Sequence, residues 1–400
     1  MTMFISSGGY LTEIAASIQH GDYSLASRRI LDYLYDTNLN GHEQLKALSF
    51  DIRKNYLQQS QSDVIDQQSL KQQCEQWLAL SAQIPVEEKE DAIAWEVYHA
   101  ENLSKEYLSR SRNFKLQPVS LHIKLGELTA VVGENGNGKT TLLRLIAGEL
   151  AKTSGTVSYF EQPDLEWYDI KGKIAYIPQR PNRWYGTLID NLNFFCSING
   201  IMGHENEDHV NYILHRLGLF QFRHLKWTEI SSGYRLRFEL AKALMMRPRL
   251  LILDEPLANL DINAQQLLLQ DLKYLSQSAK NPMGVILSSQ QLHELERNCK
   301  NIIFIKQGKT LYSGEQSTFA ADRAMNAFEI GGHFTVSDLE TRLASLEGIK
   351  IIDSGTVFII NTPLSVDAGL LLKTITQQQI PINYFRDISK STRQLFQKDI

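Results

Sequence analysis

The sequence predicts an α/β core with a parallel sheet, preceded by an all-helical unit and followed by a small α+β unit. Three observations carry this prediction. Apolar residues recur at helical spacing through residues 1–92, an apolar strand runs through a glycine-rich turn into a helix at 128–150, and short strands alternate with helices after residue 327. The expected domains are therefore 1–92, 93–320 and 327–400.

Composition limits the classes of function. The chain has 400 residues, of which 43% are hydrophobic and 22% charged, as in globular proteins with real cores. Its net charge of −4 gives no reason to expect nucleic acid as a partner. We find neither the ~18 to 20 consecutive apolar residues of a membrane helix nor the pattern of a signal peptide. The cysteines, Cys74, Cys196 and Cys299, are widely spaced and indicate a reducing compartment.

Residues 1–92 are expected to be helical throughout. The expected helices are Tyr10–Ile18, Leu25–Leu34, Leu45–Tyr56 and a Gln-rich Asp63–Ala82. Asp22 and Ser24 lie where an N-cap belongs, and 38–41 is expected to be a loop. No cluster of catalytic residue types occurs in this region of the sequence, so we interpret it as a packing or docking module.

The central stretch of the sequence is Leu128–Leu142. The strand Leu128–Val132 is followed by the spacing G-x-x-x-x-G-K-T and then by a helix. Glycines let successive backbone N–H groups surround a phosphate, and the helix directs its positive end at the same anion. Lys139 adds a charge, and the Thr140 hydroxyl is placed to ligate Mg²⁺. A glycine turn without a ligand explains this combination poorly, so the sequence predicts a P-loop NTPase core.

A second polar site is expected where the apolar strand Leu250–Leu253 ends in Asp254 and Glu255. In a phosphate-loop protein an acid at this strand end is a partner for Mg²⁺, which fits Asp254, and Glu255 could polarise a water. The alternative is a buried strand followed by an acidic helix cap.

The His, Asp and Glu residues at 204–209 suggest a metal site at first sight. Their spacing matches no standard ligand set, however, so a solvated helix start is favoured.

Further elements alternate along the core. Expected strands are 95–100, 119–123, 155–160, 174–177, 283–289 and 302–306, and expected helices are 187–198, 207–217, 231–245 and 291–299. Tyr107 either stacks on a nucleobase or is one more half-buried aromatic; its position alone does not decide. The helix start at Ser231 is a possible anion site, but ordinary capping explains it equally well.

The tail predicts a β-α-β-β-α-β order, typical of a ferredoxin-like small domain, followed by a final helix. The expected elements are strands 328–330, 349–352, 357–360 and 382–385 and helices 336–346, 364–376 and 392–398. The fold alone gives this domain no function.

The ordered set of motifs resembles the ATP-binding subunit of ABC transporters. The set is Gly133–Thr140, Gln179, Ile230–Tyr234, Leu250–Glu255 and Leu257–Asp261, within residues 95–315. The stretch 102–107 is similar to the family's first strand, whose aromatic stacks on adenine, which favours that role for Tyr107. Two further stretches resemble exporter-type subunits: the segment Thr187–Phe195 and the tail up to Phe396. Residues 1–92 lie outside the family pattern.

The resemblance implies roles for individual residues. The residues expected at the phosphates are Gly133, Asn135, Gly136, Gly138, Lys139, Thr140 and Thr141. Thr140, Gln179 and Asp254 would surround Mg²⁺ and the attacking water, with Glu255 as general base. Ser231 and Gly233 would contact ATP held by a second copy of the chain, and Asp261 would couple the two sites.

The sequence also departs from the family pattern. Ser232 stands where the signature motif has a glycine, and Tyr234 where it has a glutamine. Gln290 takes the place of the switch histidine, since His293 is three residues too late. A glutamine can hydrogen-bond a phosphate oxygen but carries no charge. We therefore expect Mg-dependent ATP binding with slow hydrolysis to ADP and phosphate.

The leading hypothesis is a transport ATPase that docks through 184–198 on a separate integral membrane permease at the inner face of the cell membrane. The resemblance of Thr187–Phe195 and of the tail to exporter-type subunits favours export over import. The rival is a soluble ATP-switched signalling scaffold whose N-terminal helices recruit a partner that the sequence does not identify. A nucleic-acid-linked ATPase is weaker, because the chain is slightly acidic and has one such cassette.

Overall fold

The computed structural model describes residues 7–61, 66–86, 95–109, 112–160, 166–290, 295, 298–316, 318 and 325–389. The chain divides into two compact units, the first comprising 1–290 with 305–310 and the second 291–304 with 311–400. The three-domain division stays a prediction. The final helix expected at 392–398, and most of the helix expected at 291–299, fall outside the described residues.

The chain begins with four helices, as the periodicity predicts. They are α1 (Ser7–Gln19), α2 (Tyr23–Asp36), α3 (Glu43–Gln59) and α4 (Gln67–Ser81). Asp22 caps α2 by accepting a 2.9 Å hydrogen bond from the Leu25 N–H, so the expected cap is confirmed. The stretch expected as a loop contains a short 3₁₀ turn, Leu39–Gly41.

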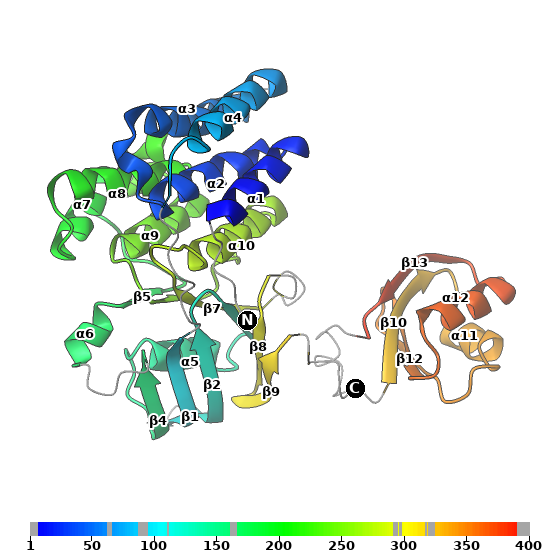
Figure 1. Cartoon of the computed structure of the whole chain (residues 1–400). Coiled ribbons are helices and arrows are strands. Elements are labelled where there is room, and N and C mark those ends of the chain that lie inside the picture. The colour runs from blue at the N-terminus through cyan, green and yellow to red at the C-terminus, as the bar shows by residue number, and fades with distance from the viewer. Residues whose placement is uncertain are drawn as a thin grey trace. The chain divides into compact units, whose positions relative to one another are not determined.

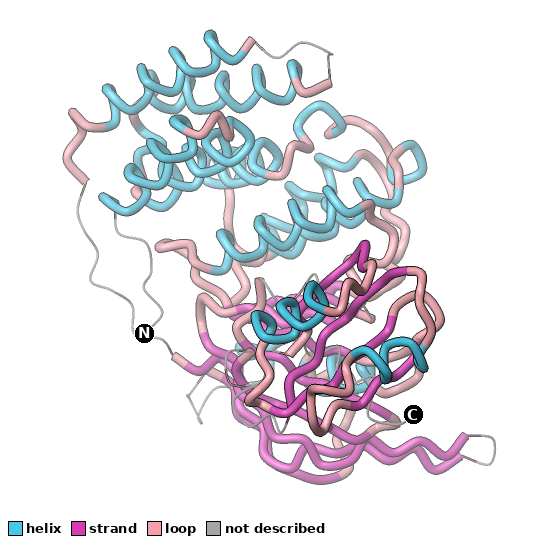
Figure 2. The backbone as a smooth tube through the Cα atoms, turned by 90° about the vertical axis from the view of Figure 1, so that its right-hand side faces the viewer, coloured by secondary structure: helices cyan, strands magenta, loops and turns pink. Residues whose placement is uncertain are grey.

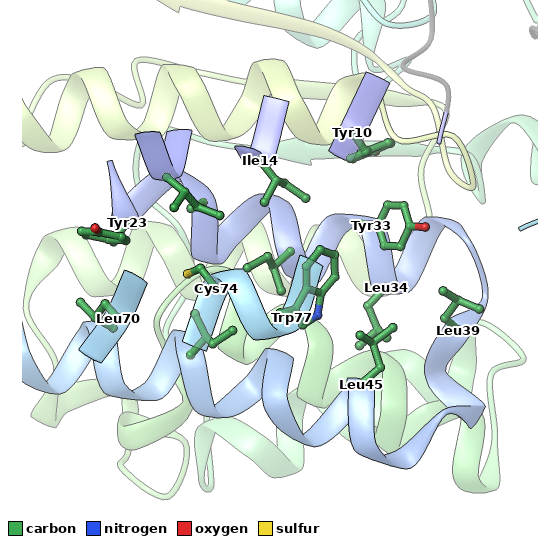
Figure 3. Packing of buried hydrophobic residues seen from close by; sticks show 14 residues of the cluster. Tyr10, Ile14, Tyr23, Tyr33, Leu34, Leu39, Leu45, Leu70, Cys74 and Trp77 are labelled. Atoms are coloured by element: carbon green, nitrogen blue, oxygen red, sulfur yellow. The ribbon is translucent and has the colours of Figure 1, made fainter. Parts of the chain in front are cut away.

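These four helices enclose a core of their own (Figure 3). Tyr33 packs edge-on against Trp77, with ring centroids 5.4 Å apart. The Trp77 side chain is fully buried, and its Nε1 donates a 2.8 Å hydrogen bond to Ser49 Oγ. The buried polar end of the tryptophan is therefore satisfied inside the helical core.

The main sheet of the first unit is parallel. Its strands β5 (Ile174–Ile177), β6 (Leu250–Leu253), β7 (Gly284–Ser289) and β3 (Leu128–Val132) lie in that order. Residues 305–310, from the adjoining β8 (Asn301–Lys306) and β9 (Lys309–Glu315), continue this sheet beyond β3. Ile177 pairs with Leu253, and Val132 with Ser289. The strands β5, β6, β7 and β3 therefore present their carboxyl ends at one edge, where α/β proteins bind ligands.

A smaller antiparallel sheet has the strand order β2-β1-β4. Its strands are β1 (Glu96–Ser109), β2 (Arg112–Lys124) and β4 (Ser154–Tyr159). The strands β1 and β2 form one long hairpin, in which Tyr107 pairs with Phe114. The sequence predicts shorter strands than the structure has, because the outer half of the hairpin is rich in polar residues and only one of its faces carries apolar side chains.

Further α-helices of the first unit are α5 (Lys139–Ile146), α6 (Trp167–Lys171), α7 (Leu188–Ile198), α8 (Gly203–Arg216), α9 (Ser232–Met245) and α10 (Ile262–Ser276). Of these, α5, α6, α9 and α10 pack against strands of the parallel sheet. The helices α6 and α10 are present in the structure but were not predicted from the sequence. Within the first unit, α9 and α10 lie between the four N-terminal helices and the strands, whereas α8 packs beside α2 and α3 (Figures 1 and 2).

The second unit contains a four-stranded antiparallel sheet of order β11-β12-β10-β13, with helices α11 and α12 packed on one core. Along the chain the elements are β10 (Met325–Gly332), α11 (Val336–Arg342), β11 (Lys350–Asp353), β12 (Phe358–Pro363), α12 (Ala368–Gln377) and β13 (Ile382–Asp387). This is the β-α-β-β-α-β order expected from the sequence.

Across the described ranges of the chain, none of the helices has both the length and the apolar character that crossing a bilayer requires.

Candidate functional site

The glycine loop, residues 133–140, joins β3 to α5 at the carboxyl edge of the sheet. A Cβ at Gly133 would lie 2.2 Å from the carbonyl oxygen of Ile305, and one at Gly138 would lie 2.7 Å from Phe114 Cζ. Gly136 has φ +81° and Gly138 φ +106°, backbone angles that glycine adopts without strain. Glycine is thus required by close packing at Gly133 and by packing and backbone conformation at Gly138.

Asn137 fixes the loop to the turn between β8 and β9, a role that the sequence did not suggest. Its buried Oδ1 accepts a 3.0 Å hydrogen bond from the Gln307 N–H, and its carbonyl oxygen accepts one of 3.1 Å from the Gly308 N–H. A Cβ at Gly308 would lie 2.1 Å from the Lys115 carbonyl oxygen. The glycine loop is therefore held by the β8–β9 turn, which has room only for glycine at position 308.

Lys139, the first residue of α5, directs its side chain back into the loop. Its Nζ donates hydrogen bonds to the carbonyl oxygens of Gly133 (2.6 Å) and Glu134 (3.2 Å). The same Nζ lies 2.8 Å from Glu255 Oε1, and both side chains are buried. The loop cation and the acid at the end of β6 thus form a buried ion pair.

The Asp254 carboxylate is held on both oxygens. Thr140 Oγ1 donates a 2.8 Å hydrogen bond to Oδ2, and Ser288 Oγ donates one of 2.7 Å to Oδ1. Burial, and next the negative charge of Asp254, raises the pKa of the Tyr176 hydroxyl on β5. The structure therefore brings Thr140 and Asp254 into direct contact although 114 positions separate them in the sequence.

Ser288 also holds Glu255, because its Oγ accepts a 2.8 Å hydrogen bond from the Glu255 N–H. Glu255 has φ +49°, in the left-handed region that non-glycine residues seldom occupy. Such a conformation persists only where the surroundings impose it. Here the Ser288 hydroxyl and the Lys139 ammonium hold the backbone and the side chain of Glu255, respectively.

The donor set fits Mg²⁺, the metal that the fold implies. A hydroxyl and a carboxylate oxygen, Thr140 Oγ1 and Asp254 Oδ2, meet at the carboxyl edge, and Mg²⁺ takes oxygen ligands of this kind. By contrast, the cluster at 204–209 forms a helix start, as expected, although Asn206 and His209 in it are buried rather than solvated. His209 is buried against Tyr35 and the Leu244 carbonyl, and among the described residues no group of three or more His, Cys, Asp or Glu side chains could hold a metal.

Gln179 and Gln290 are exposed at the same edge of the sheet. Gln179 follows β5 by two residues, next to the β6 end that carries Asp254. Gln290 directly follows β7, beside the β3 end that carries the glycine loop. Asn135 is likewise exposed at the loop, and Thr141 is half-buried in the first turn of α5.

Tyr107 is half-buried on the long hairpin and reaches the loop through a second aromatic. Its ring centroid is 6.3 Å from that of Phe114, and Phe114 in turn packs against Gly138. Lys105 Nζ lies 5.4 Å from the Tyr107 centroid. The structure thus places an aromatic pair beside the loop; Phe114 was not identified from the sequence.

Ser231, Gly233 and Asp261 belong to two helix starts that adjoin each other. Ser231 caps α9 by accepting from the Tyr234 N–H (3.4 Å), and Asp261 caps α10 by accepting from the Ala264 N–H (2.9 Å). Gly233 is next to Leu260, since a Cβ on it would lie 3.4 Å from Leu260 Cδ2. Both capping residues are exposed, so they are open to another molecule.

Residues 116–258 match the family model described as "ABC transporter". An uncharacterized ABC transporter ATP-binding protein, YxlF of Bacillus subtilis, is 31% identical over 58% of this chain and 75% of its own length. The energy-coupling factor transporter ATP-binding protein EcfA1 of Streptococcus thermophilus is 32% identical over 52% of this chain and 76% of its own. Among solved structures, cbiO1 of Clostridium perfringens, part of the cbiONQ complex, superposes with a TM-score of 0.50 at 24% identity, covering 57% of this chain and 92% of its own.

Proposed function

Because this chain belongs to the family of ABC transporter ATP-binding proteins, which bind and hydrolyse ATP, we propose that it drives a separate integral membrane permease, in the direction of export, through ATP-dependent pairing of two copies. The observation that carries the proposal is the contact of the glycine loop with Asp254 and Glu255 at one sheet edge. The named relatives are transporter proteins, which favours transport over a soluble signalling scaffold.

The phosphates of ATP are bound by the backbone of the glycine loop and by Lys139, with Asn135, Thr140 and Thr141 beside them. Thr140, Asp254 and Gln179 would hold Mg²⁺, which neutralises charge on the phosphates when it is bound. Lys139 exchanges its ion pair with Glu255 for the phosphates. The carboxylate of Glu255 is thereby freed to accept the proton of the attacking water.

Tyr107 stacks on the adenine, supported by its contact with Phe114. The exposed ends of α9 and α10 face the second copy: Ser231 and Gly233 reach the γ-phosphate that it holds, and Asp261 couples the two sites. Ser232 adds a side chain where the α9 start approaches the phosphates of the second copy. Gln290 cannot become charged, so turnover is slower than it would be with a histidine at position 290.

The permease docks on the segment from Trp184 to Ile198, which we extend to the exposed Met202. Four of its large apolar side chains are exposed: Tyr185 (82%), Phe194 (61%), Ile198 (59%) and Met202 (69%). Exposed apolar residues gathered on one segment indicate an interaction surface. The chain accordingly acts at the inner, cytoplasmic face of the cell membrane, with residues 1–92 as a helical accessory domain and 327–400 as a ferredoxin-like domain.

Affinity purification from membranes of the native cell tests the docking surface. The intact chain should retain a protein with several membrane spans, and the double variant Tyr185→Ser/Phe194→Ser should lose it. Tyr168→Ser is the matched control, since Tyr168 is 84% exposed on α6, outside the segment. Recovery of only a soluble partner, unaffected by the double variant, would contradict transport and favour the scaffold.

A further inference from the structure

We propose that Arg28 and Asp32 of helix α2 are positioning residues of the ATPase, which act through Arg216 and Asp271 to hold the helix starts at Ser231 and Asp261 in the geometry that pairing of two copies requires. The inference gives the N-terminal helices a function inside the chain, and it rests on the proposed pairing. Neither residue contacts the glycine loop or the acids at the end of β6.

Four residues form what we term the α2 network: Arg28, Asp32, Arg216 and Asp271. Arg216 of α8 donates through Nε to Asp32 Oδ1 (2.6 Å) and through Nη1 to Asp271 Oδ1 of α10 (2.6 Å). Arg28 donates to the same Asp271 Oδ1 (2.5 Å). Helix α2 therefore closes a bridge between α8 and α10, with Asp32 on one side and Arg28 on the other.

All four side chains are buried: the exposed fractions are 2% for Arg28, 4% for Asp32, 0% for Arg216 and 8% for Asp271. Charged side chains are almost never buried to this degree unless they are paired, because each must lose its hydration. On an undocked α2 helix Arg28 would lose Asp271 and Gln270 and keep only the Ser24 carbonyl of its own helix. The α2 network therefore indicates a permanent contact between α2 and the rest of the first unit. A detachable adaptor would not bury charged side chains in this way.

The contact continues to the end of α2. Asp36 accepts hydrogen bonds from Ser278 Oγ (2.6 Å) and the Ala279 N–H (2.9 Å), just beyond α10. The Tyr35 hydroxyl lies 3.0 Å from His209 Nδ1 on α8 and accepts from Asn281 Nδ2 at 3.0 Å. From its middle to its C-terminal end α2 thus contacts α8 and the α10 region, which leaves these two elements little freedom to move apart.

The held helices lead directly to the proposed pairing surface. Helix α10 starts at its cap Asp261, and Gln265 in its first turns donates through Nε2 to the carbonyl oxygens of Leu257 and Leu260 (3.0 Å each). Helix α8 packs against α9, which starts at its cap Ser231. A shift of α8 relative to α10 would therefore change the separation of Ser231 and Asp261 while the glycine loop stays in place.

Steady-state ATPase kinetics of the full chain test the inference. Arg28→Gln removes one cation and leaves Asp271 paired with Arg216, so the fold is expected to survive; Asp32→Asn is the second variant. We expect kcat to fall about three- to thirty-fold in each, while KM for ATP changes less than about twofold. Arg28→Lys, which keeps the charge, should recover part of the turnover.

Lys46→Gln is the matched control. Lys46 pairs with Asp208 at 2.9 Å and so also joins the N-terminal helices to α8, but it lies outside the α2 network and is partly exposed. Its kcat should stay at the wild-type value. Rates are measured well below each variant's melting temperature, so that loss of stability alone would leave kcat unchanged. Unchanged or increased kcat in both Arg28→Gln and Asp32→Asn would overturn the inference.

ATP-dependent dimerisation in the Glu255→Gln background separates the two proposals. If that parent dimerises with Mg-ATP, addition of Arg28→Gln should weaken the dimer; an equally stable dimer would overturn the inference. If the parent itself stays monomeric, the proposed pairing fails, and with it the positioning role at the pairing surface.

Discussion

The ammonium group of Lys139 and the carboxylate of Glu255 lie 2.8 Å apart, buried at the carboxyl edge of the parallel sheet. In the proposed mechanism Lys139 binds the phosphates and Glu255 is the base, and in this structure these two groups neutralise each other. Breaking the buried pair leaves both charges to be compensated, which the phosphates and Mg²⁺ would do in the proposed ATP-bound site. Under this proposal, the ion pair links ATP binding at Lys139 to activation of Glu255 as the base.

Replacing the acid tests this link. Glu255→Gln should lower kcat by at least about a hundredfold, because the base is lost. It should also leave ATP affinity unchanged or increased, because a neutral side chain competes less for Lys139. Turnover by phosphate release and equilibrium binding of ATP report the two effects. Glu149→Gln, at a partly exposed pair with Arg144, is the control; loss of ATP binding in Glu255→Gln would contradict the link.

Removing the shared hydroxyl tests whether Ser288 orients the two acids. Ser288→Ala deletes the donor to Asp254 and the acceptor of the Glu255 N–H. Hydrogen bonds to charged groups are worth about 1.5–3 kcal/mol, so kcat should fall about ten- to hundredfold. Ser276→Ala is the matched control, since Ser276 is equally buried and its hydroxyl donates to the Lys273 carbonyl, away from both acids. Equal kcat in the two variants would rule out the role of Ser288.

The residue after β7 is expected to limit turnover. Gln290→His should raise kcat, because a histidine can carry the charge that glutamine cannot. Gln290→Ala should change it little. Gln378→His, an exposed position of the second unit, controls for the added histidine. A wild-type rate typical of efficient members of the family that disappears in Gln290→Ala would refute slow turnover.

Acid should destabilise the first unit through two buried histidines. Burial and then the charge of Arg247 lowers the pKa of His209 to about 4, and burial and then Arg53 lowers that of His215 to about 4. Between pH 6.5 and 4 the unfolded chain therefore binds more protons than the folded one. The free energy of unfolding should fall as the pH drops through this window, by up to about 1.4 kcal/mol per pH unit for each histidine.

Urea unfolding at several pH values measures this slope. His209→Gln should make it shallower, whatever it does to stability at pH 7. His204→Gln should leave it unchanged, because the His204 side chain is fully exposed. An identical slope in wild type and His209→Gln would contradict the assignment.

Much of this fold could be predicted from local patterns. Strand β5 and the caps Asp22 and Ser231 follow from apolar runs and helix-start residues, which act within a few positions along the chain. Helix α10 had a readable signal as well, since Leu268, Leu272 and Leu275 keep helical spacing, yet it is absent from the expected elements. The glycine loop was found because its spacing and its place between strand and helix agree.

Other features depend on contacts that no local pattern encodes. Ser288 meets Asp254 only because β7 pairs with β6 in a register that sets their ends side by side. Arg28 and Asp32 look like a solvated helix face in the sequence, but both are buried against helices more than 180 residues away. Only tertiary packing distinguishes a buried charge from a surface one.

Light scattering on wild type and Glu255→Gln, with Mg-ATP and without nucleotide, tests the central claim most directly. The account predicts that Glu255→Gln is monomeric without nucleotide and dimeric with Mg-ATP, since binding closes the site and hydrolysis no longer reopens it. A Glu255→Gln chain that binds Mg-ATP and remains monomeric would contradict ATP-dependent pairing and with it the proposed mechanism of transport.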